Sequence, residues 1–124
     1  MNKLEYIPGD LGTYNGNIVT IENSDGYYAT YYDEDEFLQE VNVNAIESIP
    51  LTPAILEKNG WKRDGKWYYL PTQRAYLYIT QDTGQPDEFL ICAGECKHNL
   101  TSVSFVHQLQ HFLFGLNINS DMEV

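Results

Sequence analysis

The sequence contains few basic residues. Seven lysine and arginine residues stand against eighteen aspartate and glutamate residues, which gives a formal net charge of −11. A surface of this sign repels nucleic-acid phosphates and anionic lipid head groups, so we expect neither as a direct partner. The charge remains compatible with a basic protein partner, with mimicry of a polyanion, or with solubility alone.

Long apolar runs are also missing. No stretch reaches the roughly 18 residues that a membrane-spanning helix needs. The first residues, MNKLEYIPGD, lack the apolar segment of a signal peptide. The two cysteines, Cys92 and Cys96, are expected to be free thiols. These absences together predict a cytoplasmic protein without a membrane partner.

Core-forming residues are present in sufficient number. Hydrophobic residues make up 43% of the 124 positions, enough for one domain or two very small ones. Ten tyrosines favour strands and half-exposed surfaces. The acids are unevenly placed, because residues 1–50 hold ten acids and one base, whereas residues 51–124 hold eight acids and six bases. Nearly all of the negative excess therefore belongs to the first half.

Residues 10–50 are predicted to form short strands joined by tight turns. Asn15-Gly16 favours a two-residue hairpin turn, and Asp25-Gly26 marks the next turn. YYATYY follows as a strand, and the acidic run 33–36 predicts a further turn before FLQEV returns. Four short strands at this spacing predict a small antiparallel Src-homology-3-like β-barrel unit over residues 1–50.

The same segment supplies a possible partner-binding surface. Tyrosines offer contact area, and carboxylates steer a basic partner. The residues concerned are Tyr27, Tyr28, Tyr31 and Tyr32, followed by Asp33, Glu34, Asp35 and Glu36. The alternative is a solvated tyrosine face beside a solvated turn.

Residues 51–124 are predicted to form an α+β unit. Thr52 as N-cap, Pro53 at the first helical position and Gly60 after the end predict a short helix. Asp64-Gly65 predicts a hairpin turn, and RAYLYIT and EFLICA continue a three- or four-stranded antiparallel meander. We expect both halves to pack together as one compact α+β chain.

A closing helix is predicted from Phe105 onward. Apolar residues recur at helical spacing, with Ser104 as the expected cap. The predicted buried stripe consists of Val106, Leu109, Leu113 and Leu116. His107 and His111 lie one turn apart on one side of this helix, and Gln108 and Gln110 are placed on its other faces.

Two cysteines and two histidines have a spacing close to that of a zinc finger. Cys92, Cys96, His107 and His111 give C-x3-C-x10-H-x3-H, with a central spacer shorter than that of the two-Cys, two-His finger. A chain with this large a core does not need a metal, so we expect no metal or cofactor and keep zinc as an alternative. A cysteine–histidine pair could act as a nucleophile, but no nucleophile motif or phosphate loop accompanies it. We therefore expect no enzymatic activity.

Two blocks, IESIPLTPAILEKNGW and SFVHQLQHFLFGL, resemble a family of small uncharacterised proteins from Bacteroidetes and their phages or mobile elements. The matching residues are Ile46, Ile49, Pro50, Leu51, Thr52, Ile55, Leu56 and Gly60, then Val106, His107, Gln108, Leu109, Gln110 and Leu113. The resemblance implies no established activity. The family position that matches His111 is typically asparagine, so a metal site at His107 and His111 would be specific to this chain.

The resemblance also draws attention to three polar side chains in an apolar frame. His107, Gln108 and Gln110 are expected to bond neighbouring backbone and join the two halves, or else to form a contact surface. The sequence thus predicts a non-enzymatic accessory protein of a phage or mobile element, which acts through protein contacts. The alternatives are an acidic inhibitor that mimics nucleic acid and a small zinc-binding module.

Overall fold

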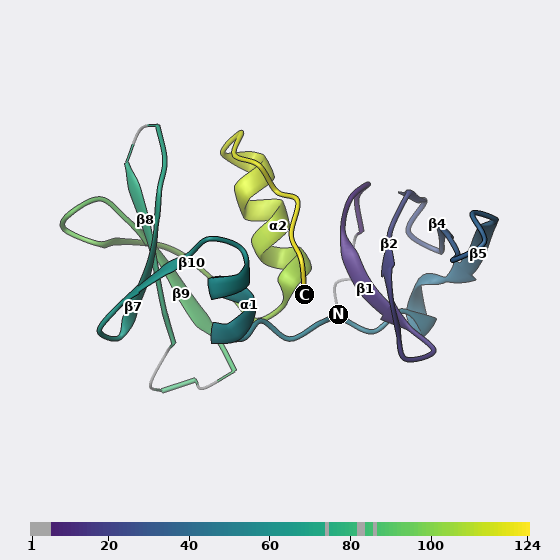
Figure 1. Cartoon of the computed structure of the whole chain (residues 1–124), viewed down its shortest axis with the longest axis horizontal. Coiled ribbons are helices and arrows are strands. Elements are labelled where there is room, and N and C mark those ends of the chain that lie inside the picture. The colour runs from purple at the N-terminus through teal and green to yellow at the C-terminus, as the bar shows by residue number, and fades with distance from the viewer. Residues whose placement is uncertain (1–5, 74, 82–83, 86) are drawn as a thin grey trace.

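The computed structural model describes residues 6–73, 75–81, 84–85 and 87–124. It has a mixed α+β architecture with two α-helices, many short strands and open sheets (Figure 1). The predicted α+β class is therefore confirmed. A closed Src-homology-3-like barrel is not confirmed, because the described strands form three separate sheets.

The first half contains five strands rather than the four expected. They are β1 (Leu11–Tyr14), β2 (Asn17–Thr20), β3 (Asn23–Ser24), β4 (Tyr28–Tyr32) and β5 (Leu38–Asn42), followed by the 3₁₀-helix η1 (Val43–Ala45). Strands β1 and β2 form one sheet, and β3, β4 and β5 form another. Asn15 and Gly16 have φ of 50° and 78°, which confirms the two-residue turn between β1 and β2.

The second half begins with α1 (Pro53–Lys58) and continues into a five-stranded antiparallel sheet. Its strands are β6 (Lys62–Asp64), β7 (Trp67–Pro71), β8 (Tyr76–Gln81), β9 (Phe89–Ala93) and β10 (His98–Val103), hydrogen-bonded in sequence order. Thr52 Oγ1 accepts the Ile55 N–H at 3.2 Å, which confirms the predicted N-cap. Gly60 follows the helix at φ 91°, as its C-terminal position requires.

Two details of this sheet correct the prediction. The loop of the first hairpin is Gly65-Lys66, because Asp64 already pairs with Trp67 in the ladder. Strand β10 is a fifth strand beyond the three or four predicted, and five of its six residues are exposed. Among the described strands it lies at the edge and pairs with β9, and only its Val103 is buried, so it lacks the apolar alternation of an inner strand.

Helix α2 (Val106–Gly115) lies between the five-stranded sheet and β1 (Figure 1). Val106, Leu109 and Leu113 are buried as predicted, but Leu116 lies beyond the helix end and is 46% exposed. Two polar side chains of α2, His107 and Gln110, are buried as well. Gln110 bonds Leu11 and His107 lies against Tyr6, so the chain buries polar groups where the two halves meet.

Two separate hydrophobic clusters form the core. The cluster in the first half consists of Tyr6, Val19, Ile21, Ala29, Val43 and Ile46. The larger one consists of Leu11, Leu51, Leu56, Trp61, Tyr68, Leu77, Ile79, Phe89, Ile91, Val103, Val106, Leu109 and Leu113. Leu11 of β1 belongs to the second cluster and Ile49 packs against it, so the first half contributes apolar side chains directly to the core beneath α2.

Candidate functional site

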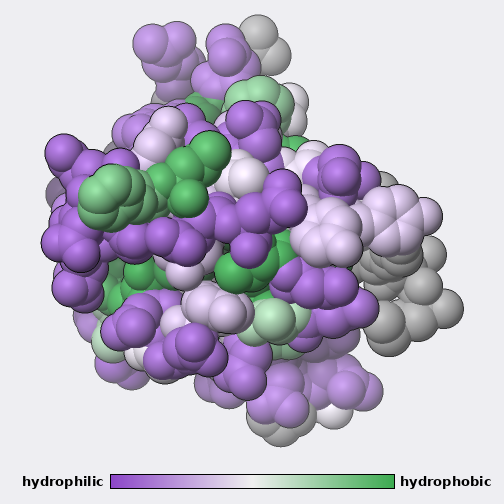
Figure 2. Space-filling view, turned by 90° about the vertical axis from the view of Figure 1, so that its right-hand side faces the viewer, coloured by the Kyte–Doolittle hydropathy of each residue, from purple (hydrophilic) through white to green (hydrophobic). Residues whose placement is uncertain are grey.

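Large apolar or aromatic side chains are exposed on and directly beside the sheet formed by β3, β4 and β5. We call this region the N-terminal face, and it consists of Tyr28, Tyr32 and Leu38 on the strands, with Tyr27 and Phe37 directly preceding β4 and β5. Tyr32 lies opposite Leu38 in the ladder, so both side chains leave the same side of the sheet. Figure 2 shows this side of the molecule, where hydrophobic side chains lie among hydrophilic ones.

Tyr31 differs from the three other predicted tyrosines. It points to the opposite side of β4, where its ring centroid lies 6.0 Å from that of Tyr14. Strand alternation dictates this separation, because Tyr31 stands between Thr30 and Tyr32 and side chains alternate between faces. Tyr28 and Tyr32 therefore share the side of β4 opposite Tyr31, and Tyr27, which directly precedes β4, is also exposed.

The acidic turn next to this face uses one of its carboxylates internally. The Asp33 side chain accepts hydrogen bonds from the Asp35 N–H, the Phe37 N–H and Gln39 Nε2, at 2.8–2.9 Å. The Phe37 N–H is the main cause that lowers the pKa of Asp33. Glu34, Asp35 and Glu36 are exposed around it. Asp33 thus shapes the turn, and the three following carboxylates face solvent.

Phe37 and Leu38 were not singled out from the sequence. Their side chains are 66% and 55% exposed, so neither belongs to the hydrophobic core. The signal was available in the predicted hairpin itself, because a tight turn at 33–36 brings residue 38 opposite the exposed Tyr32. Their position adds aliphatic and aromatic area directly beside the three solvent-facing carboxylates.

Gln108 and Gln110 of α2 both bond backbone groups. Gln108 Oε1 accepts the N–H groups of Ser104 and Phe105 at 2.7 and 3.1 Å, so it caps the helix in place of the Ser104 side chain that we expected. Gln110 Oε1 accepts the Leu11 N–H at 3.0 Å, and its Nε2 donates to the Gly9 carbonyl at 2.9 Å. Nε2 also lies 3.2 Å from the Ser120 carbonyl. Gln110 therefore ties β1 to α2 and to the C-terminal segment.

A buried carboxylate pairs with a histidine at the same junction. Asp10 Oδ2 lies 2.5 Å from His111 Nε2 and accepts the Ile7 N–H at 2.8 Å. Burial raises the pKa of Asp10 although the Ile7 N–H and His111 act to lower it. Sequence reasoning counted Asp10 only as one more acid, because nothing local shows that a partner 101 positions away covers it.

His107 lies deeper in this junction. Its ring centroid is 5.1 Å from Tyr6, 6.0 Å from Phe105 and 5.7 Å from His111. Burial, helped by the nearby His111, lowers the pKa of His107 to about 4. An imidazole of this kind is neutral near pH 7 and is a poor general base there. In the described part of the chain, neither His107 nor His111 bonds a serine, threonine or cysteine side chain.

The four residues of the possible zinc site are not brought together. Cys92 is buried on β9, where its Sγ donates to Asn99 Oδ1 at 3.0 Å and burial raises the pKa of its thiol. Cys96 is exposed in the turn between β9 and β10. Within the described residues, no three His, Cys, Asp or Glu side chains form a group that could hold a metal ion. The spacing in the sequence therefore has no counterpart in space.

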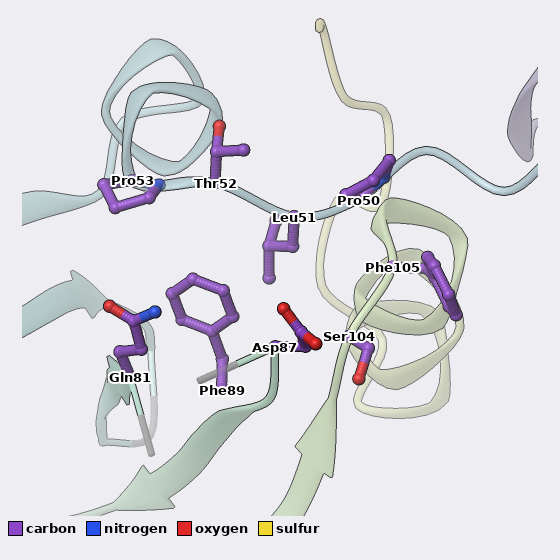
Figure 3. Close-up of a pocket in the computed structure, with 9 residues that line it drawn as sticks. All are labelled: Pro50, Leu51, Thr52, Pro53, Gln81, Asp87, Phe89, Ser104 and Phe105. Carbon is purple, nitrogen blue, oxygen red and sulfur yellow. The ribbon is translucent and has the colours of Figure 1, made fainter. Parts of the chain in front are cut away.

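A pocket of about 510 Å³ lies where the segment before α1 meets the end of β10 (Figure 3). Its lining consists of Pro50, Leu51, Thr52, Pro53, Gln81, Asp87, Phe89, Ser104 and Phe105. The side chains of Phe89 and Leu51 point toward each other across it (Figure 3). Asp87 is the one ionisable group among these lining residues, so they provide no acid–base pair or nucleophile–base pair.

Comparison of the chain with protein-family models, with curated proteins and with solved structures gave no match. None of the helices in the described residues is long and apolar enough to cross a membrane. The N-terminal face, with its acidic turn, is therefore the strongest candidate site that geometry offers.

Proposed function

We propose that this protein is a non-enzymatic accessory protein of a phage or mobile element, which acts in the cytoplasm of a bacterial host by binding a protein partner through the N-terminal face. The observation that carries this proposal is the exposure of five large apolar or aromatic side chains on or directly beside one small sheet. Exposed apolar surface concentrated on one part of a folded domain commonly marks a contact site.

A basic surface is the chemistry we propose for the partner. Glu34, Asp35 and Glu36 lie at the edge of the N-terminal face, and residues 1–50 hold ten acids against one base. Aromatic residues provide the contact area of many interfaces, and rim charges orient the incoming partner. The resemblance of the two sequence blocks to proteins of Bacteroidetes and their mobile elements supports the proposed cellular setting.

We further propose that residues 1–50 form a barrel-like unit and residues 51–124 a second, α+β unit. Two contacts support the barrel-like arrangement. Thr13 of β1 pairs with Glu47 through two backbone hydrogen bonds of 2.9 and 2.8 Å, just after η1. The Glu22 N–H donates to the Thr30 carbonyl at 2.7 Å, which links the segment between β2 and β3 to β4. The separate hydrophobic clusters support the division near residue 50.

For His107, Gln108 and Gln110 we propose a structural role. Gln108 caps α2 and Gln110 bonds the backbone of β1, while His107 fills the junction between Tyr6 and Phe105. These contacts satisfy backbone groups that packing of the two halves removes from water. The motif therefore orients the N-terminal face relative to the second half.

An acidic inhibitor that mimics nucleic acid is the second candidate, favoured by the consecutive exposed carboxylates of the acidic turn. The two candidates differ in which side chains carry the affinity. Apolar docking depends on Phe37 and Leu38 and survives salt, whereas mimicry depends on the carboxylates and weakens as salt rises.

Affinity capture from host lysate separates these candidates. The wild-type protein is compared with Phe37→Ser/Leu38→Ser and with Glu34→Gln/Asp35→Asn/Glu36→Gln, each at low and high salt. Ile18→Ser is the matched control, because Ile18 is an exposed apolar residue on β2, outside the N-terminal face. We expect a basic protein that the first variant loses and the control retains. Capture of the same proteins by every variant would exclude this face.

A further inference from the structure

The five-stranded sheet has a second face, opposite the core. Leu77 and Ile79 of β8 point into the core beneath α1 and α2, so strand alternation places Tyr76 and Tyr78 on the other side. Tyr69 of β7 pairs with Tyr78 in the ladder and shares that side, as does Trp67. We call Trp67, Tyr69, Tyr76 and Tyr78 the outer aromatic face.

These four rings form a continuous surface across two strands. Tyr69 and Tyr76 are parallel within 3°, with centroids 5.9 Å apart. Tyr69 and Tyr78 are 6.4 Å apart, and Trp67 meets Tyr78 edge-on at 6.2 Å. Tyr76 is 48% exposed and the other three rings are partly exposed. Exposed aromatic rings of this kind can accept planar rings by stacking, with Tyr69 and Tyr76 as the parallel pair.

Lysine side chains lie beside the outer aromatic face. Lys97 Nζ lies 4.5 Å from the Tyr78 centroid and 5.6 Å from that of Trp67, and Lys66 Nζ lies 5.8 Å from Trp67. Lys62 of β6 is paired with Tyr69. Five of the seven basic residues fall between positions 58 and 74, where Asp64 is the sole acid. Residues 61–103 as a whole hold five bases and five acids, so the positive charge is local to the outer aromatic face, where these lysines lie.

A shallow depression of about 320 Å³ lies within this surface. It is lined by three rings of the outer aromatic face and by a basic and an acidic side chain, namely Tyr69, Tyr76, Tyr78, Arg63 and Asp64. Guanidinium and carboxylate groups supply hydrogen-bond donors and acceptors, respectively, beside a stacking surface. A planar heterocycle with a mixed donor and acceptor edge matches this set of groups.

The negative charge of the first half does not prevent a polyanion from reaching this surface. Strands β7 and β8 lie at one end of the molecule and β4 and β5 at the other, with α2 between them (Figure 1). Exposed charges are screened beyond about 8 Å at physiological ionic strength. The expectation that net charge excludes nucleic acid therefore does not extend to the outer aromatic face.

We propose that the outer aromatic face binds single-stranded nucleic acid. The bases stack on the rings of Trp67 and the tyrosines. The side chains of Lys62, Lys66 and Lys97 neutralise phosphates. The depression at Arg63 and Asp64 receives the edge of one base. A single strand is specified because bases in a duplex are stacked on each other and cannot lie on protein rings. This site is independent of the proposed protein partner at the N-terminal face.

Fluorescence anisotropy of a labelled single strand of about 12 thymidines tests this proposal. We expect binding at low salt that weakens as salt rises, and much weaker binding of the matching duplex. Tyr76→Ala should weaken binding about tenfold, whereas Tyr76→Phe should retain it because the ring is kept. Lys66→Gln/Lys97→Gln should weaken binding and flatten its salt dependence.

Controls separate loss of the site from loss of the fold. Lys58→Gln removes one positive charge from α1 and should leave binding nearly unchanged, and all variants are checked by thermal melting. No binding of the single strand at low salt, or equal binding by all variants, would overturn the proposal. A dimer in light scattering that disappears in Lys66→Gln/Lys97→Gln, without strand binding by the wild type, would instead assign this face to the acidic half of a second copy.

Discussion

At the scale of single residues, His107 is an ionisable side chain whose protonation depends strongly on the fold. It is buried among rings, and its pKa falls to about 4 from the ordinary 6.5. Between pH 4 and pH 6.5, His107 therefore binds a proton in the unfolded chain but stays neutral in the folded chain. Stability is fully present above about pH 6.5 and falls as the pH drops toward 4.

We predict that titration of His107 alone lowers the free energy of unfolding by up to roughly 3 kcal/mol as the pH falls from 6.5 to 4. His107→Leu should flatten the pH dependence of the urea midpoint in that window, and His98→Gln on the exposed β10 is the control. Asp10 acts in the opposite direction at low pH, because its raised pKa makes the folded state take up a proton first. Parallel curves for wild type and His107→Leu would contradict the prediction.

Gln110 is the residue that joins the halves through the most backbone contacts. Its amide serves the Leu11 N–H and the Gly9 and Ser120 carbonyls. Gln110→Leu should destabilise the protein by about 2 kcal/mol or more, since buried backbone groups lose their partners. Urea denaturation measures this loss. Gln108→Ala is the comparison and should cost about 1 kcal/mol, as for a lost helix cap. Equal, small losses for both would show that water replaces the Gln110 amide.

At the scale of elements, the turns and caps of this fold rest on local preferences. Asn15 and Gly16 both adopt positive φ, so the β1–β2 turn needs residues that tolerate the left-handed region. Thr52 and Gly60 mark the two ends of α1 for similarly local reasons. A helix of six residues is not stable alone, and Leu56 anchors it in the core.

The β1–β2 turn allows a clean test of backbone strain. A Cβ at Gly16 would meet no atom within 4 Å, so Gly16→Val acts through its φ of 78° alone. We expect a loss of about 1 kcal/mol or more in thermal or urea unfolding. Gly16→Asn should cost less, because asparagine tolerates positive φ. Gly115→Ala, also without close neighbours, should not destabilise. An unchanged melting temperature for Gly16→Val would argue against the turn.

At the scale of the whole molecule, the main feature is the separation of charge. Residues 1–50 hold ten acids and one base, whereas residues 61–103, which include the five-stranded sheet at the other end, hold five of each (Figure 1). Lys66 and Lys97 lie against the outer aromatic face of that sheet, so the two surfaces differ in local charge in a way that a single value of net charge does not reveal. Each surface pairs its charges with exposed aromatic rings, so each has the composition of a contact site.

The acidic turn is expected to steer a basic partner. Glu34→Gln/Asp35→Asn/Glu36→Gln should slow association and flatten its salt dependence, because exposed charges act mainly on the association rate. Asp33 is left in place since its carboxylate holds the turn. The measurement is the association rate with a captured partner at two salt concentrations, and Glu22→Gln outside the turn is the control. Equal rates at low salt would leave these charges as a solubility feature.

Local features of this protein were determined by its sequence alone. The Asn15-Gly16 turn, the Thr52 cap and the burial of Val106, Leu109 and Leu113 depend on interactions within a few residues, and all were predicted. The alternation of apolar and polar residues along the strands was also enough to predict most strands of the five-stranded sheet. The exposed edge strand β10 was missed, since its pairing with β9 leaves little trace in hydrophobic pattern.

Only the tertiary structure decided which distant residues meet. Asp10 and His111, or Leu11 and Gln110, are about a hundred positions apart, and their contact depends on how α2 packs against β1. The same packing separated Cys92 and Cys96 from the histidines and placed the tyrosines of β7 and β8 among lysines. Periodicity specifies which face of an element is buried, but the partner across that face is fixed by the packing of the whole chain.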